Sequence, residues 1–531
     1  MKLVKSLILG SAAGLIAMGG AQAADLPVKA KAVEYVKICS LYGAGFYYIP
    51  GTDTCIKLGG YLRVDMGVNT NGIFTADYTA PGGYGNRFTN AMTWRSREDL
   101  NIDTRTATEY GVVRTFFDAT FTWTDDGYTA NAASYTGASA TVPLASVYSQ
   151  LGQGIGGAVN ATAGSVAYGT LGVYYAFIQF AGFTIGKAIS PFSAPWTAYP
   201  GNNYDALVGG GGTVTGVNQF VYTAQFGNGV SGTVGFQDPT QYYQAGVLNF
   251  GFQGVAGFAN SAAATGVNDY AGTVAPDIVA NLNVTQAWGM AQLSVAAHDN
   301  NAAYYINSGA LNTITGHPDD KWGFAVQGAL SIANIPTGAG DTINAQAVYT
   351  NGATRYNIQD LASAAGAWTT FAGTNVGGAL GKIGIGVAPD SVFNFGGQQQ
   401  LISTWGGRAA FNHNWNPYWS TSVYGAYAAV NWGSNNGSGN AASIFCTSLA
   451  SSGAAYAGVT TCNPNYSVTQ IGTVTRWTPV KNLTFSAEYV YSHLQQNMAG
   501  TITTSGSYGT GVYVIGNQDT HQVLLRAQRN W

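Results

Sequence analysis

Charged side chains occupy alternate positions of one short segment, residues 93 to 105, whose sequence is TWRSREDLNIDTR. The positions of one parity carry Arg95, Arg97, Asp99, Asn101, Asp103 and Arg105. Successive residues on one face of a β-strand lie about 7 Å apart, so these side chains would form a ladder of charge on a single wall. At the narrowing of a channel, such a ladder sets an electric field that selects ions. The alternative is that the arginines pair with Asp99 and Asp103 and only keep the wall hydrated.

Further arginines on other predicted strands would point to the same side of the sheet as this ladder. They are Arg63, Arg114, Arg408 and Arg526. Arg63 lies on the strand before the ladder and Arg114 on the strand after it. We assign the field-setting role first to Arg95, Arg97 and Arg114.

Loop 190 to 216 is the candidate constriction of such a channel, because it contains three prolines and a run of glycines that suit a chain folding back on itself. Its one acidic residue, Asp205, would face the arginine wall if the loop folds inward. Trp196, Tyr199 or Tyr204 would then narrow the passage. The alternative is an ordinary surface loop.

Residue patterns typical of enzymes and metal sites are poor in this chain. The five histidines are scattered, and none has the spacing of metal ligands. The stretch GQGIGG at 152 to 157 matches a nucleotide-binding pattern, but no helix is predicted after it. We therefore predict no catalytic activity, no metal and no cofactor. The acid pairs Asp125–Asp126 and Asp319–Asp320 either collect divalent cations or lipopolysaccharide at an outer rim or simply hydrate their loops.

Four cysteines form two pairs with the same separation of 16 residues: Cys39 with Cys55, and Cys446 with Cys462. In an exported protein an even number of cysteines indicates disulfides. We predict these two pairings, with free or differently paired thiols as the alternative.

The elements that must position these residues are short strands of alternating polarity. In IKLGGYLRVDMGV, residues 56 to 68, apolar residues hold most even positions, and Lys57, Arg63 and Asp65 are at odd ones. In a soluble sheet the apolar face would enter a core, and in a membrane barrel it would meet lipid. The pattern predicts sixteen strands in the sequence, at 56–68, 92–105, 108–123, 171–180, 183–189, 217–226, 230–238, 277–286, 290–299, 321–334, 341–352, 401–413, 418–431, 466–478, 481–494 and 519–531.

The connections between these strands are alternately a few residues and roughly 20 to 50 residues long, which is typical of an outer-membrane barrel with short periplasmic turns and long extracellular loops. The fold class is therefore all-β, a 16-stranded antiparallel transmembrane barrel with an inward-folded third loop. The long loops 124–170 and 353–400 have no readable conformation.

The N-terminus and the composition agree with an exported barrel. Lys2 and Lys5 precede an apolar run that ends in AQA, which predicts a signal peptide over 1–23. The apolar run is shorter than the ~20 residues of a spanning anchor. Charged residues make up 8% of the chain, against ~25% in soluble domains. The net charge of −3 gives no basic face for nucleic acid.

The stretch VEYVKICSLYGAGFYYIPGTDTCIKLGGYLR, residues 33 to 63, closely resembles the N-terminal signature of alphaproteobacterial general porins. The resemblance continues in EYGVVRTFF, FIQFAGFTIGKAIS, VYTAQFGNG, PDIVANLNVTQAWG and QVLLRAQRNW. It implies a trimeric sixteen-stranded barrel of the outer membrane with an inward third loop, which passes small hydrophilic solutes by diffusion. The family's constriction arginines correspond to Arg95, Arg97 and Arg114. The single acid of the third loop departs from the family pattern.

Three functions are therefore compared. The first is a passive, water-filled porin, whose partners are lipid, lipopolysaccharide, small solutes and two further copies of the chain. The second is a channel specific for a sugar or peptide, with a binding path of Trp196, Tyr199 and Tyr204. The third is a closed barrel with no conductance. Residues 24–55 are expected to form a periplasmic helix and a disulfide-closed loop, and 56–531 the barrel.

Overall fold

The computed structural model describes residues 37–70, 74, 92–124, 165–166, 169–205, 207–212, 215–250, 267–268, 270–307, 310–311, 313–359, 368–372, 380–437, 439–451, 456–504 and 511–531. Within them, sixteen antiparallel strands form a closed barrel. The strands are β2 (Thr54–Val68), β3 (Met92–Thr108), β4 (Gly111–Thr124), β6 (Gly169–Phe180), β7 (Phe183–Ala188), β8 (Val217–Gly227), β9 (Val230–Gln237), β12 (Asp277–Gln286), β13 (Gly289–Asn300), β16 (Lys321–Ala333), β17 (Thr342–Asn351), β22 (Ser403–Asn416), β23 (Trp419–Asn431), β25 (Tyr466–Val480), β26 (Leu483–Gln496) and β29 (Gln518–Asn530). The predicted fold class is confirmed.

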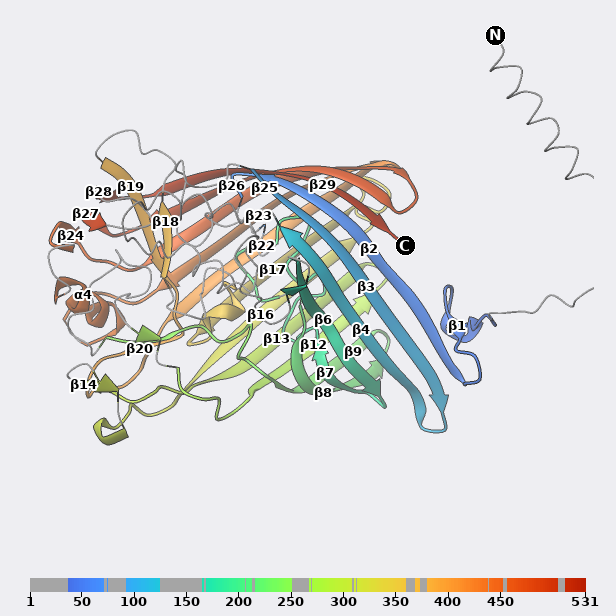
Figure 1. Ribbon diagram of the computed structural model, residues 1–531, viewed down its shortest axis with the longest axis horizontal. Helices are drawn as coiled ribbons and strands as arrows, with labels where there is room; N and C mark the ends of the chain where they lie inside the picture. Colours follow the sequence, from blue (N-terminus) through green and yellow to red (C-terminus); the bar gives the residue numbers. More distant parts are fainter. Residues whose placement is uncertain are drawn as a thin grey trace, which may run out of the picture.

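Each strand pairs with its neighbours in this order, and β29 closes the ring by pairing with β2. Short turns connect the strands at one end of the barrel, and the long loops lie at the other end (Figure 1). β1 (Tyr47–Tyr48) and the C-terminus lie at the end of the short turns (Figure 1). This alternation of short and long connections is the one predicted from the sequence.

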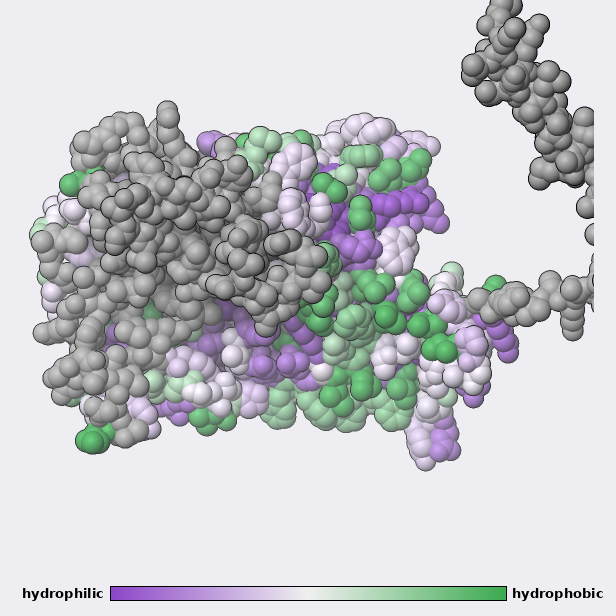
Figure 2. Space-filling view, viewed as in Figure 1, coloured by the Kyte–Doolittle hydropathy of each residue, from purple (hydrophilic) through white to green (hydrophobic). Residues whose placement is uncertain are grey.

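The outer wall of the barrel is apolar and the inner wall is polar. In β2, Leu58 and Leu62 are 44% and 53% exposed on the outside, whereas Asp65 is fully buried on the inside. Hydrophobic residues gather on the outer wall over β4, β7 and β8 (Figure 2). Charged and amide side chains on so many inward faces require water in the lumen or partners there. The strand of residues 56 to 68 therefore belongs to a membrane barrel.

Smaller elements lie in the segments between the barrel strands, several of them at the end of the long loops (Figure 1). They are β5 (Ser165–Val166), β10 (Val247–Asn249), β11 (Val267–Asn268), β14 (Ile306–Asn307), β15 (Ala310–Leu311), β18 (Trp368–Ala372), β19 (Leu380–Val387), β20 (Ser391–Phe393), β21 (Gln400–Leu401), β24 (Val459–Thr461), β27 (Ala499–Thr504), β28 (Gly511–Ile515), two 3-10 turns, η2 (Thr313–Thr315) and η3 (Thr354–Tyr356), and the helix α4 (Ala441–Ser451). The described part of the chain has no helix that is long and apolar enough to cross a membrane.

Helix α4 was not predicted from the sequence. The side chain of Asn440 caps it by accepting a hydrogen bond from the backbone N–H of Ser443 at 3.0 Å. A disulfide joins Cys446 in the helix to Cys462 beyond β24. The helix packs its buried face, including Phe445, against the other loop segments.

The segment before β2 forms a small disulfide-closed loop with the 3-10 turn η1 (Ser40–Tyr42). Cys39 is bonded to Cys55, which lies inside β2, and both are buried with Phe46. The guanidinium of Arg105 lies 4.8 Å from the ring of Phe46, so this loop contacts β3 at the end of the short turns. The predicted signal peptide and almost all of the predicted helix lie outside the described residues, as does most of loop 124–170.

Candidate functional site

The third loop, residues 189 to 216, folds into the barrel and follows its inner wall. Side chains from β12 to β25 donate hydrogen bonds to its backbone carbonyls. These are Asn281 to Pro191 (2.7 Å), Gln327 to Phe192 (2.9 Å), Asn344 to Pro200 (2.7 Å), Arg408 to Leu207 (2.9 Å) and Arg476 to Gly201 (2.8 Å). The loop is therefore a fixed lining of this wall, and the predicted inward fold is confirmed.

The glycine run of the loop allows this close contact. Gly209 has a φ of +86°, and a Cβ at this position would lie 2.3 Å from the carbonyl oxygen of Gly407 in β22. A side chain at Gly209 would therefore push the loop away from the wall.

An ion cluster fixes the loop on the opposite wall. Arg95 of β3 donates to Asp205 of the loop at 2.9 Å and, through Nε, to Asp65 of β2 at 2.8 Å. Arg526 of β29 donates to the second oxygen of Asp65 at 2.6 Å. The cluster contains two guanidiniums and two carboxylates, so it is neutral as a whole. Arg95 is only 1% exposed, and a buried ion pair of this kind is costly to break.

This cluster sets the protonation of two side chains of the loop, Asp205 and Tyr199. Burial raises the pKa of the Asp205 carboxyl, but the guanidiniums of Arg95, Arg97 and Arg526 and the hydrogen bond from Tyr199 together outweigh burial and hold the pKa below its usual range. Burial and the negative charge of Asp205 raise the pKa of Tyr199 well above the usual value for tyrosine. The Tyr199 hydroxyl therefore stays protonated and donates its hydrogen bond to Asp205.

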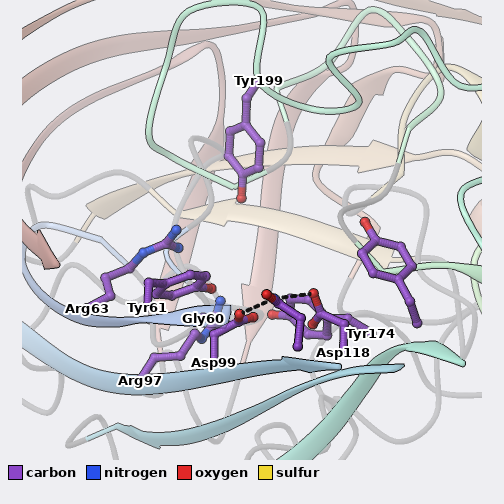
Figure 3. A pocket seen from close by; sticks show the side chains of 10 residues that line it. Gly60, Tyr61, Arg63, Arg97, Asp99, Asp118, Tyr174 and Tyr199 are labelled. Carbon is purple, nitrogen blue, oxygen red and sulfur yellow. Dashed lines mark hydrogen bonds between the residues drawn. The ribbon is translucent and has the colours of Figure 1, made fainter. Parts of the chain in front are cut away.

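The edge of the loop and the β2–β3–β4–β6 wall enclose a cavity of about 330 Å³ (Figure 3). Tyr199 points into it from the loop, and the charged side chains reach it from the wall. Its lining consists of Gly60, Tyr61, Arg63, Arg97, Asp99, Asn101, Asp118, Tyr174, Tyr175 and Tyr199. Of the residues predicted for the constriction, five line this cavity: Arg63, Arg97, Asp99, Asn101 and Tyr199.

The two arginines of the cavity form no ion pair within the described residues. Arg63 donates through Nε to Gln528 at 2.8 Å, and Arg97 through Nε to Thr122 at 2.9 Å. The positive charges of both guanidiniums can therefore attract solutes in the cavity. Arg95, in contrast, lies behind the loop and is not part of the lining.

The two carboxylates of the cavity are also without an ion pair in the described part of the chain. The side-chain amide of Asn101 donates to Asp99 at 2.7 Å and to Asp118 at 3.1 Å, so it joins them. Asp118 was not singled out in the sequence, although it has the same parity on its strand as Arg114. The cavity therefore holds charges of both signs.

A second cavity, of about 450 Å³, lies on the β4–β8 wall beside Pro191 of the loop. Arg114 and Gln179 line it, and Arg114 forms an ion pair with Asp103 at 3.0 Å. Asp103 also pairs with Arg105 at 2.9 Å. Asp103 thus forms ion pairs with arginines, which is one of the two alternatives that the sequence left open.

Other predicted loop residues have structural partners. Trp196 donates to Gln346 on the wall at 3.0 Å, and Tyr204 is fully buried. Arg408 and Arg526 face inward as predicted, but both hold the loop. Tyr199 alone of the three predicted aromatic residues lines the 330 Å³ cavity.

A buried network that the sequence did not indicate holds several loops together. His298 of β13 lies with Nδ1 2.6 Å from Asp277 and with Nε2 3.5 Å from Asp390. Tyr356 donates a hydrogen bond to Asp277, and its ring lies 4.6 Å from that of Phe192 in the third loop. Loops of distant sequence are thus fastened to the base of the third loop. No cluster of three or more His, Cys, Asp or Glu in the described residues is arranged for a metal ion.

A closed sixteen-stranded barrel with an apolar outer wall, a polar lumen and an inward loop defines an outer-membrane channel protein. Comparison with known families gives the same class, because the model of the Porin subfamily matches residues 25–521. The chain belongs to this porin family and to the bacterial outer membrane.

Two curated relatives come from Brucella. Over 237 residues the chain is 34% identical to porin Omp2a of Brucella ovis, covering 44% of this chain and 59% of that porin. It is 30% identical to porin Omp2b of Brucella suis over 341 residues, covering 63% of this chain and 75% of that porin. Among solved structures, the outer membrane channel DcaP of Acinetobacter baumannii has a TM-score of 0.52, at 14% identity, over 91% of this chain and 99% of DcaP. This last likeness concerns the fold alone.

Proposed function

We propose that the chain forms a water-filled passage for the passive diffusion of small hydrophilic solutes and ions. The observation that carries this proposal is the 330 Å³ cavity between the third loop and the wall, with unpaired charges of both signs. Its route runs past Tyr199 of the loop and Arg63, Arg97 and Asp99 of the wall. In this proposal Arg95 positions the loop.

Passive diffusion needs no chemistry, and the proposal includes no enzyme activity and no cofactor. The alternative of a sugar- or peptide-specific channel required Trp196, Tyr199 and Tyr204 to form one path. The indole of Trp196 is bonded to the wall, and the ring of Tyr204 is buried. This geometry does not favour that alternative.

We also propose that three copies associate in the membrane and that the acid pair Asp319–Asp320 lies at the rim near lipopolysaccharide. The trimer rests on the resemblance of the sequence to general porins. Chemical cross-linking of the protein in outer-membrane vesicles tests it. A ladder ending at three copies supports the trimer, and monomers alone would exclude it.

Swelling of liposomes that contain the purified protein tests the diffusion proposal. The rate of swelling is expected to rise linearly with sugar concentration. It is expected to fall steeply as the sugar becomes larger, because a narrow passage excludes large solutes. A rate that saturates with concentration would favour specific binding, and liposomes that do not swell would contradict a channel.

A further inference from the structure

Charged side chains of both signs line the 330 Å³ cavity. Arg63 and Arg97 supply the positive charge, and the neighbouring carboxyl groups of Asp99 and Asp118, which lie within hydrogen-bonding reach of each other, supply the negative charge. In the described residues none of the four forms an ion pair. A simple anion or cation therefore gains on one side of the cavity and loses on the other. A solute that carries both charges gains on both sides.

These charges are ordered along the strands. Arg63 of β2 is paired in register with Arg97 of β3, and the next inward residue of β3 is Asp99. One further step along the same face, Asn101 is paired with Asp118 of β4. Each step along a face is about 7 Å. The positive end of the cavity therefore lies toward the long loops and the negative end toward the short turns.

The burial of these groups makes their charges effective. Arg97, Asp99 and Asp118 are 8%, 2% and 7% exposed. The side chains of Asp99 and Asp118 also lie within hydrogen-bonding reach of each other. Charge interactions are stronger in such surroundings than in water. Two neighbouring carboxylates, joined through one amide, attract a cationic donor group.

Tyrosines supply the remaining surface of the cavity. Tyr61 lies under the guanidinium of Arg63, with 4.4 Å between the guanidinium carbon and the ring centre. Tyr199 approaches from the loop, opposite the wall (Figure 3). Aromatic faces with polar tips suit the apolar part of a small solute, and the volume is at the lower end of the range for ligand pockets.

We propose that this cavity is a binding subsite for zwitterionic solutes of amino-acid size. Arg63 and Arg97 receive the carboxylate, Asp99 and Asp118 receive the ammonium group, and the tyrosines contact the side chain. This inference rests on the proposed function, because the solute must enter the passage to reach the cavity. The subsite retains such solutes on their way through and needs no closed state.

Current recordings from single channels in planar bilayers test the inference. Three probes share one ring system: tryptophan, which is a zwitterion, N-acetyltryptophan, which is an anion, and tryptophan methyl ester, which is a cation. Each is added at the side of the long loops, and the dissociation constant for current block is measured. Tryptophan is expected to bind at least tenfold more tightly than either of the other two.

Two double variants separate the two ends of the subsite. Asp99→Asn with Asp118→Asn is expected to remove the advantage of tryptophan over N-acetyltryptophan. Arg63→Gln with Arg97→Gln is expected to remove its advantage over the methyl ester. The matched control is Asp319→Asn with Asp320→Asn, which changes the net charge as much as the first variant but acts at the loop end.

The outcomes distinguish this inference from the proposed function. Equal block by all three probes, or an unchanged advantage of tryptophan in both double variants, overturns the subsite while the open channel still conducts. If Asp99 and Asp118 do not contact the ammonium group, tryptophan and its methyl ester bind the first variant as tightly as the unmodified protein, which also overturns it. Absence of conductance in the unmodified protein would instead contradict the proposed channel.

Discussion

The ion cluster at the third loop makes a quantitative prediction for Asp205→Asn. Asp65 and Asp205 balance Arg95 and Arg526, so the cluster is neutral in the unmodified protein. The substitution keeps the shape of the side chain but leaves one positive charge in excess. Tyr199, which is bonded to Asp205, lines the passage. The new charge therefore acts at roughly the length of a tyrosine side chain from permeating ions.

The size of the effect follows from Coulomb's law. Two unit charges about 7 Å apart interact by about 0.6 kcal/mol in water, which is about a threefold change in local ion concentration. Chloride is enriched and potassium is depleted by this factor, so the permeability ratio of chloride to potassium is expected to rise roughly sevenfold. The effect weakens as salt is raised, because the screening length is about 10 Å at 0.1 M. The assay is the reversal potential of many channels under a KCl gradient, at low and at high mean salt.

The control for this prediction is Asp320→Asn, which makes the same change of net charge outside the barrel. Its reversal potential is expected to move much less. A reversal potential of Asp205→Asn that equals that of the unmodified protein would refute the argument. An equal shift in both variants would show that only net charge matters and would also refute it.

Four other substitutions test separate parts of the structure. Arg97→Ala is expected to shift ion selectivity toward cations, as measured by the reversal potential. Arg95→Ala is expected to lower the free energy of unfolding by about 3–5 kcal/mol, as measured by urea unfolding, because it leaves buried carboxylates unpaired. Burial raises the pKa of Asp341, but three hydrogen bonds outweigh burial and bring it to about 2. Its stabilising effect is therefore present above the ordinary pKa near 3.8 and is lost as the pH falls toward 2, so Asp341→Asn is expected to flatten the decline of stability across this range. Leu62→Arg places a charge on the lipid face and is expected to cost about 2–4 kcal/mol near the bilayer midplane, as measured by unfolding in liposomes.

Each of these expectations has a contradicting result. Equal reversal potentials for Arg97→Ala and the unmodified protein would remove Arg97 from the passage. An unfolding curve of Arg95→Ala like that of the unmodified protein would show that the cluster does not fix the loop. An unchanged slope of stability with pH in Asp341→Asn would show that another group titrates. Tolerance of Leu62→Arg would indicate that this face does not meet lipid.

The barrel could be predicted from the sequence because its determinants are local. Alternation of apolar and polar residues, as in β2, needs only neighbours along the chain to be recognised. Even the short β7, predicted at 183–189 and observed at Phe183–Ala188, follows from the turn before it. The alternation of connection lengths then excluded a soluble sheet. These signals do not depend on where the loops go.

The different roles of the arginines could not be predicted from the sequence. Arg95 and Arg97 have the same parity and similar neighbours, yet one is clamped by Asp205 and the other faces the cavity. The difference arises from the path of the loop. That path is set largely by bonds to backbone carbonyls, such as that from Asn344 to Pro200, and these bonds leave no pattern in the sequence.

The position of Asp118 in the cavity could have been predicted from the sequence with one further inference. Asp118 follows Arg114 by four residues and so points to the same side of β4. Its pairing with Asn101 then follows from the short turn between β3 and β4. The network of His298 was beyond such reasoning, because Asp390 lies in a loop far along the chain.

Thiol labelling of a cysteine at position 101 tests the position of the passage most directly. All four native cysteines are in disulfides, so Asn101→Cys introduces the only free thiol. A bulky methanethiosulfonate reagent added to open channels is expected to reduce their current sharply. Labelling of the rim variant Asp320→Cys is expected to leave the current nearly unchanged. Full labelling of Asn101→Cys without loss of current would contradict a passage between the third loop and the β2–β3–β4 wall.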